Sequence, residues 1–191
     1  MSLFARCFHS LFAALLISSL AACGGGGDGD GAASADAVKV DARISPYVGR
    51  WVACSITSSN NSEKDEFLVT AIGGSKTAVT RTLTQHAGSA NCASSPTPIL
   101  EEKSVMTLLG ATVTVVDPAI GSITLEKLSQ AGDRLTYSGN PPNPTTSPFS
   151  GTVFAGVVDG SPAVIRIGDA DPLNAQSNPT ALLPQVYAKQ P

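Results

Sequence analysis

The chain has 191 residues, of which 42% are hydrophobic and 14% are charged, and its formal net charge is −3. This weakly acidic balance argues against nucleic acid as a partner, because nucleic-acid binding needs a basic surface. The length is sufficient for one typical domain with a substantial core, in addition to an N-terminal leader.

Residues 1–22 have the three parts of a secretory signal peptide. Arg6 is the only charged residue before an apolar run over residues 11–20, and the small residues Ala21 and Ala22 follow it. The apolar run is shorter than the roughly 20 residues that a membrane-spanning helix needs. We therefore expect a cleaved leader rather than a permanent transmembrane anchor.

The segment Leu20-Ala21-Ala22-Cys23 resembles the lipobox of bacterial lipoproteins. The resemblance implies diacylation of the Cys23 thiol, cleavage before Cys23 and acylation of the new amino group, which together would anchor the chain stably to a membrane. In such lipoproteins a glycine after the lipidated cysteine, here Gly24, usually goes with the outer membrane. We therefore expect an outer-membrane lipoprotein of the cell envelope, facing the periplasm or the cell exterior. An ordinary signal peptide with a chance cysteine is the alternative.

Residues 23–42 are predicted to form a disordered tether that carries the lipidated cysteine. Residues 24–27 are all glycine, and the aspartates that follow are separated mainly by Gly, Ala and Ser. Such a segment buries too little apolar surface to offset the entropy cost of ordering it. The folded domain is expected to cover residues 43–191.

The domain is predicted to be all-β, because its short β-rich runs alternate with turn signals and no long amphipathic helix is present. The predicted strands cover residues 48–56, 66–72, 76–85, 103–109, 111–117, 121–129, 134–139, 150–158 and 163–168. This order favours an antiparallel meander of about eight strands that closes into a small up-and-down barrel, with a β-sandwich as the alternative.

The segments between these strands are predicted as loops or turns. Residues 57–65 are polar, residues 140–148 are rich in proline, and Gly132-Asp133 has the composition of a turn. The tail over residues 169–191 is predicted to be extended chain wrapped on the body. Within residues 76–85, Val79, Arg81 and Leu83 alternate with threonines, which indicates a strand with one dry and one wet face.

Two of the four cysteines remain in the mature domain once Cys7 is removed with the leader and Cys23 is lipidated. In an oxidising compartment such a leftover pair usually forms a disulfide, so we predict that Cys54 and Cys92 are joined. A metal-binding or redox pair is the alternative, although the chain has no Cys-x-x-Cys motif.

Gly49-Arg50-Trp51, at the start of the first predicted strand, resembles the Gly-x-Trp motif of lipocalins and related calycin barrels. The resemblance implies a β-barrel with a ligand cavity, whose closed end is plugged by Trp51. It also implies that a basic residue of the last strand crosses the Trp51 ring in a cation–π contact. Arg166 matches that basic position in this sequence.

The motifs of common catalytic sites are absent from the sequence. There is no nucleophile elbow, phosphate-binding loop or zinc spacing, and His86 is predicted to be an isolated surface histidine. The adjacent carboxylates Asp65-Glu66 and Glu101-Glu102 would point to opposite faces of a strand. Asp169 and Asp171 suggest either a turn held by Asx hydrogen bonds or a weak calcium site.

These observations predict a non-enzymatic, lipid-anchored lipoprotein without a cofactor. Its expected partner, besides the membrane, is a small apolar ligand bound inside the barrel or another protein of the envelope. A structural or assembly lipoprotein with a filled barrel, acting through protein–protein contacts, is the alternative function. An exposed apolar patch would favour that alternative, whereas a cavity would favour ligand binding.

Overall fold

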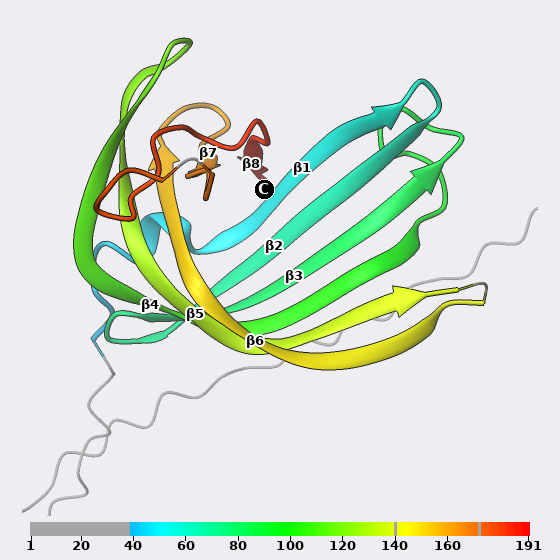
Figure 1. Cartoon of the computed structure of the whole chain (residues 1–191), viewed down its shortest axis with the longest axis horizontal. Coiled ribbons are helices and arrows are strands. Elements are labelled where there is room, and N and C mark those ends of the chain that lie inside the picture. Colours follow the sequence, from blue (N-terminus) through cyan, green and yellow to red (C-terminus); the bar gives the residue numbers. More distant parts are fainter. Residues whose placement is uncertain (1–38, 140, 172) are drawn as a thin grey trace, which may run out of the picture. The chain divides into compact units, whose positions relative to one another are not determined.

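A computed structural model describes residues 39–139, 141–171 and 173–191. The predicted signal peptide, the lipidation site Cys23 and most of the predicted tether lie outside these residues. The described chain folds into eight strands and one short 3₁₀ helix, η1 (Ser45–Tyr47) (Figure 1). The strands are β1 (Gly49–Ser58), β2 (Asn61–Gly73), β3 (Lys76–Ala87), β4 (Thr97–Asp117), β5 (Gly121–Ser138), β6 (Asn143–Val158), β7 (Val164–Ile167) and β8 (Tyr187–Lys189).

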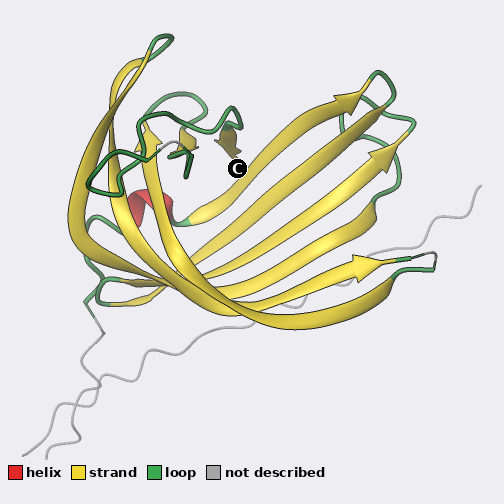
Figure 2. Ribbon diagram, in the orientation of Figure 1, coloured by secondary structure: helices red, strands yellow, loops and turns green. Residues whose placement is uncertain are grey.

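The eight strands form one antiparallel meander in which each strand pairs with its neighbour in sequence. β8 pairs with β1, where Lys189 lies opposite Trp51, and this pairing closes the sheet into a barrel. The predicted all-β fold is therefore confirmed, and the barrel is favoured over the sandwich. Figure 2 shows how strands dominate the domain and how the C-terminal loops lie within the curve of the sheet.

Several strands are longer than predicted. β2 begins at Asn61 rather than residue 66, β4 begins at Thr97, and β5 runs without interruption through Gly132-Asp133. Gly132 is a packing position, since a β-carbon there would lie 2.1 Å from the Lys103 carbonyl oxygen of β4. Gly132 therefore allows the backbones of β4 and β5 to approach closely and does not form a turn.

Strand β6 corrects the prediction of a proline-rich loop over residues 140–148 from Asn143 onward. The Phe154 carbonyl accepts a hydrogen bond from the Gly168 amide (2.8 Å), so the backbone of Phe154 faces away from β5. The N–H and C=O groups of successive residues point to alternate sides of a strand. Those of residues 144 and 148 therefore point to the same side as those of Phe154, and β7 does not reach that side at the two prolines. Proline removes no ladder hydrogen bond at such an edge, so the strand continues through both prolines.

Two hydrophobic cores stabilise the domain. The larger one fills the closed end of the barrel and includes Trp51, Leu108, Leu128 and Ile165. The smaller one consists of Val115, Ile123, Leu125 and Phe154. It lies between the β4–β5 hairpin and the outer face of β6 and β7. The hairpin approaches so closely that a β-carbon on Gly156 would lie 2.5 Å from the Thr124 carbonyl oxygen.

Residues 39–41, predicted to be the end of the tether, are attached to the barrel. Val40 forms an isolated parallel bridge with Gly74 in the turn between β2 and β3, and the Asp41 amide donates to the Gly74 carbonyl (2.8 Å). These three residues are therefore part of the folded domain. The chain joins the barrel at the end that Trp51 occupies.

Candidate functional site

The closed end of the barrel is filled by Trp51 and by the segment that precedes β1. Trp51 is completely buried, as predicted, and its indole N–H donates to the Tyr47 carbonyl (2.7 Å). Ile44 is also completely buried, and the Tyr47 hydroxyl donates to the Ala155 carbonyl of β6 (2.7 Å). The η1 segment is therefore fixed to both sides of the barrel and seals this end.

The cation over the Trp51 ring is Lys189 and not Arg166, which corrects the prediction. The Lys189 Nζ lies 5.2 Å from the ring centroid, and the Lys189 stem passes Gly49, where a β-carbon would lie 3.0 Å from Cε. Gly49 also has a φ of 134°, which favours glycine. The prediction failed because the strand that closes the barrel is β8, in the tail that was predicted to be merely extended.

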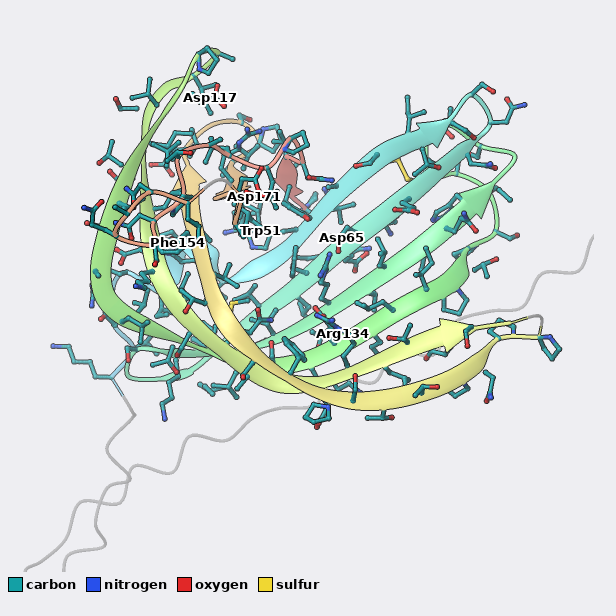
Figure 3. The ribbon with its side chains drawn as sticks, viewed as in Figure 1. Trp51, Asp65, Asp117, Arg134, Phe154 and Asp171 are labelled. Carbon is teal, nitrogen blue, oxygen red and sulfur yellow. A yellow bond between two sulfur atoms is a disulfide. The ribbon has the colours of Figure 1, made fainter. Side chains whose placement is uncertain are left out.

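Arg166 lies on the outer face of β7, because its neighbours Ile165 and Ile167 both line the interior. It is nevertheless buried, since the β4–β5 hairpin covers it. Its Nη2 donates to the Asp117 carboxylate (3.2 Å). Figure 3 shows Asp117 near the tip of the β4–β5 hairpin. Arg166 therefore ties the hairpin to the barrel wall and takes no part in the plug.

Next to the plug the barrel interior contains a cavity of about 210 Å³. Its wall is predominantly apolar and is supplied by most strands of the barrel. The apolar residues that line it include Ile44, Val69, Val79, Met106, Leu128, Val153, Ala155, Ile165 and Leu183. The barrel core is thus not completely filled, and the empty space is suited to an apolar group.

A layer of charged side chains bounds the cavity on the side away from the plug. We refer to Asp65, Arg81, Glu102 and Arg134 as the polar layer. Arg81 donates to both carboxylate oxygens of Asp65 (2.9 and 2.8 Å) and to Glu102 (3.3 Å), and Arg134 donates to the other oxygen of Glu102 (2.5 Å). Asp65 and Arg134 both project from the concave face of the sheet (Figure 3). The layer joins β2, β3, β4 and β5.

Aromatic rings support the polar layer. The Tyr187 hydroxyl donates to Asp65 (2.9 Å), and the Tyr187 and Phe67 rings meet edge to face with centroids 4.9 Å apart. The Arg81 guanidinium lies 5.4 Å from the Phe67 centroid. Burial, reinforced by the charge of Asp65, raises the pKa of Tyr187 well above its usual range. Burial of Arg81 opposes its charged form, but the hydrogen bond and the charge of Asp65 more than offset this effect and raise the pKa of Arg81.

Sequence reasoning missed the polar layer as a unit. The signal was the placement of Arg81 between Val79 and Leu83 on the predicted dry face of β3, because a charge on an interior face requires a partner. Asp65 and Glu102 are partners of that kind, with exposures of 7% and 2%. The prediction had assigned Asp65 to a loop, so its pairing across the sheet could not be inferred.

The predicted disulfide is present between Cys54 and Cys92, with an S–S distance of 2.10 Å. Cys54 follows the inward-facing Ala53 and therefore lies on the outer face of β1. The bridge holds the loop between β3 and β4 against this outer face, where the Ser62 hydroxyl accepts from the Cys92 amide (2.9 Å). The disulfide thus stabilises the wall and does not reach the cavity.

His86 is buried, with an exposure of 4%, which corrects the prediction of a surface histidine. Its Nδ1 lies 2.7 Å from the Ser94 carbonyl, and its Nε2 lies 3.2 Å from the Thr84 hydroxyl. The loop that the disulfide holds in place covers the imidazole ring. Nothing in the sequence indicated that this loop folds back over His86. His86 therefore supports the loop, on the opposite side of the wall from the cavity.

Asp169 and Asp171 form a turn, in which the Asp169 carboxylate accepts from the Asp171 amide (3.0 Å). The Asn174 side-chain oxygen accepts from the amides of Gln176 and Asn178 (2.9 and 3.0 Å). Among the described residues no group of three or more His, Cys, Asp or Glu side chains could hold a metal ion. The Asx-turn interpretation of this segment therefore accounts for the geometry.

Within residues 39–139, 141–171 and 173–191, no helix has the length and apolar character needed to cross a membrane. Comparisons of the chain with protein-family models, with curated proteins and with solved structures found no match. The functional interpretation therefore depends on the cavity, the polar layer and the sequence motifs.

Proposed function

We propose that the chain is a lipid-anchored lipoprotein of the cell envelope that binds a small apolar ligand inside its barrel and catalyses no reaction. The observation that carries the proposal is the apolar cavity of about 210 Å³ between the Trp51 plug and the polar layer. A barrel that served only as a scaffold would gain stability from filling this space, because the apolar side chains that line it forgo packing contacts.

The size of the cavity indicates the size of the ligand. An engineered apolar cavity of about 150 Å³ holds benzene, and drug-sized ligands occupy roughly 300–1,000 Å³. The volume of about 210 Å³ lies between these cases. It suits a ligand of one ring or one short chain, or the apolar part of a larger molecule.

The ligand is tested by extraction and by a matched pair of variants. Mass spectrometry of the purified mature protein should detect a co-purifying small apolar molecule. Met106→Trp should fill the cavity and abolish its retention. Val105→Trp places the same side chain at the neighbouring position on the outer face, where Val105 is 41% exposed, and should leave retention unchanged. Equal retention by both variants would contradict binding in the cavity.

The lipid anchor is supported by the complete lipobox at Leu20-Ala21-Ala22-Cys23. Cells that express the protein and receive radiolabelled palmitate should label the wild type, and fractionation should place the label in the outer membrane. Cys23→Ser should remove the label. Labelling of Cys23→Ser as strong as that of the wild type would refute lipidation at this residue.

A second candidate function, assembly through protein–protein contacts, is favoured by the β4–β5 hairpin. Val116 and Ile120 near its tip are 70% and 49% exposed, and Leu109, further down β4, is 49% exposed. Replacing these three residues with serine should leave the extracted ligand unchanged if binding in the cavity is the function. Loss of a chemically crosslinked envelope partner in the same variant would favour assembly instead.

A further inference from the structure

The barrel wall is incomplete beside the cavity. From Asn143 to Val153, β6 pairs with β5 on one side, and no strand of the described chain pairs with its other side. The same holds for β1 beyond Val52, which pairs with β2 alone. The short strands β7 and β8 close the ring only at the plug end. A gap in the wall therefore separates the free edges of β1 and β6.

Gly151 lies on the inner side of this gap. Val153, two residues further along β6, lines the cavity, so Gly151 faces the interior as well. It lies opposite Gln130 of β5, which also lines the cavity. A β-carbon at Gly151 would have no other atom within 4 Å. The inner surface of β6 is thus bare at the level where the apolar cavity meets the polar layer.

The charges of the polar layer cancel. Two carboxylates, Asp65 and Glu102, face two guanidiniums, Arg81 and Arg134, and both oxygens of each carboxylate accept hydrogen bonds. The two carboxylates are the buried members of the layer. A charged group placed beside them would disrupt a satisfied pair or remain uncompensated, and both outcomes are costly. The Gln130 amide, which donates to the Ser104 hydroxyl (3.0 Å), keeps its carbonyl oxygen and a second N–H for a ligand.

We propose that the ligand is a single-chain amphiphile with an uncharged hydrogen-bonding head, such as an alcohol or an amide, and that it enters sideways through the gap past Gly151. The apolar chain occupies the cavity and the head lies beside the Gln130 amide. This inference rests on the proposed function, because it assigns the chemistry and the route of the same ligand.

The head group is tested by measuring binding affinities at pH 7.5 with isothermal titration calorimetry. The mature protein is first stripped of any non-covalently bound ligand, and four eight-carbon probes are then titrated into it. The probes are 1-octanol, octanamide, octanoate and octylammonium. The two neutral probes should bind at least about tenfold more tightly than either ion, because an ion would remain uncompensated beside the balanced layer. Tighter binding of octanoate or octylammonium would overturn the head-group assignment and leave the proposed function intact. Failure of all four probes to bind, with no co-purifying ligand, would refute the proposed function itself.

The route is tested by exchange kinetics of fluorinated 1-octanol, followed by ¹⁹F NMR. Gly151→Phe should slow association at least about tenfold, because the ring would project into the gap. Ser150→Phe carries the same ring on the outer face of the same strand and should associate as fast as the wild type. Gly151→Leu provides a smaller obstruction and an intermediate rate, and melting curves confirm that the variants fold. Wild-type association in Gly151→Phe would overturn entrance through the gap, even if Met106→Trp still abolished binding.

Discussion

Replacement of Trp51 tests whether the plug holds the closed end of the barrel together. Its side chain is 0% exposed, and its N–H donates to the Tyr47 carbonyl at 2.7 Å. Removing a fully buried large aromatic side chain costs about 3–5 kcal/mol, and losing the hydrogen bond adds about 1 kcal/mol. Trp51→Ala should therefore lower the free energy of unfolding by roughly 4–6 kcal/mol, a large part of the ~5–15 kcal/mol that stabilises a typical domain.

The contributions of the ring and of the hydrogen bond can be separated. Trp51→Phe keeps an aromatic ring and loses the N–H, so it should cost less than Trp51→Ala, about 1–3 kcal/mol. Urea titrations followed by far-ultraviolet circular dichroism measure both variants. The wild type has a single tryptophan. Its emission should therefore be blue-shifted and resistant to iodide.

The cation above the ring provides a matched comparison. Lys189→Met keeps the stem beside Gly49 and removes the charge, so it should shift the Trp51 emission and cost about 0.5–1 kcal/mol. Arg166→Met should leave the emission unchanged, because Arg166 lies on the outer face of β7. Three results would refute this reasoning: a cost of less than about 1 kcal/mol for Trp51→Ala, ready quenching by iodide, or an emission shift in Arg166→Met alone.

Three further predictions concern the wall and the polar layer. Cys54→Ala opens a bridge across 38 residues and should lower stability by about 2–5 kcal/mol, whereas thiol titration of denatured wild type should find both cysteines blocked. Glu102→Gln should destabilise the domain by about 1–3 kcal/mol in urea titrations, because it removes the buried carboxylate that accepts hydrogen bonds from Arg81 and Arg134. Glu101→Gln, at an exposed ion pair on the same strand, should cost at most about 1 kcal/mol, and equal costs would contradict a special role for the layer. The folded state holds the Tyr187 proton more tightly than the unfolded state, so stability should fall as the pH rises above the ordinary value of 10.0. The fall should be smaller in Tyr187→Phe, and equal slopes for the two proteins would contradict the raised pKa.

The meander could be predicted from the sequence because strand order depends on local signals. The Gly73-Gly74 hairpin and the alternation around Arg81 both correspond to real features of β2 and β3. The disulfide followed from counting cysteines. The burial of Trp51 was expected from a motif rather than from composition.

The failed predictions share a physical cause, since each depended on a neighbour that is distant in sequence. Residues 140–148 were excluded from the sheet because a strand with a partner on each side cannot accommodate their prolines, but β6 has a free side there. Asp65 is too polar for an ordinary core strand, yet Arg81 on β3 and Tyr187 on β8 satisfy its carboxylate. The cavity depends on side chains from most of the barrel, so no local pattern could reveal it.

The free edge of β6 also bears on how the molecule behaves at high concentration. An exposed edge strand offers a row of unpaired amides on which a strand of another molecule can add, and repeated addition leads to aggregates. At Pro144 and Pro148 that row lacks its donors, so an approaching strand finds no continuous ladder. The prolines thus allow the barrel to keep an open seam without providing a nucleus for polymer growth.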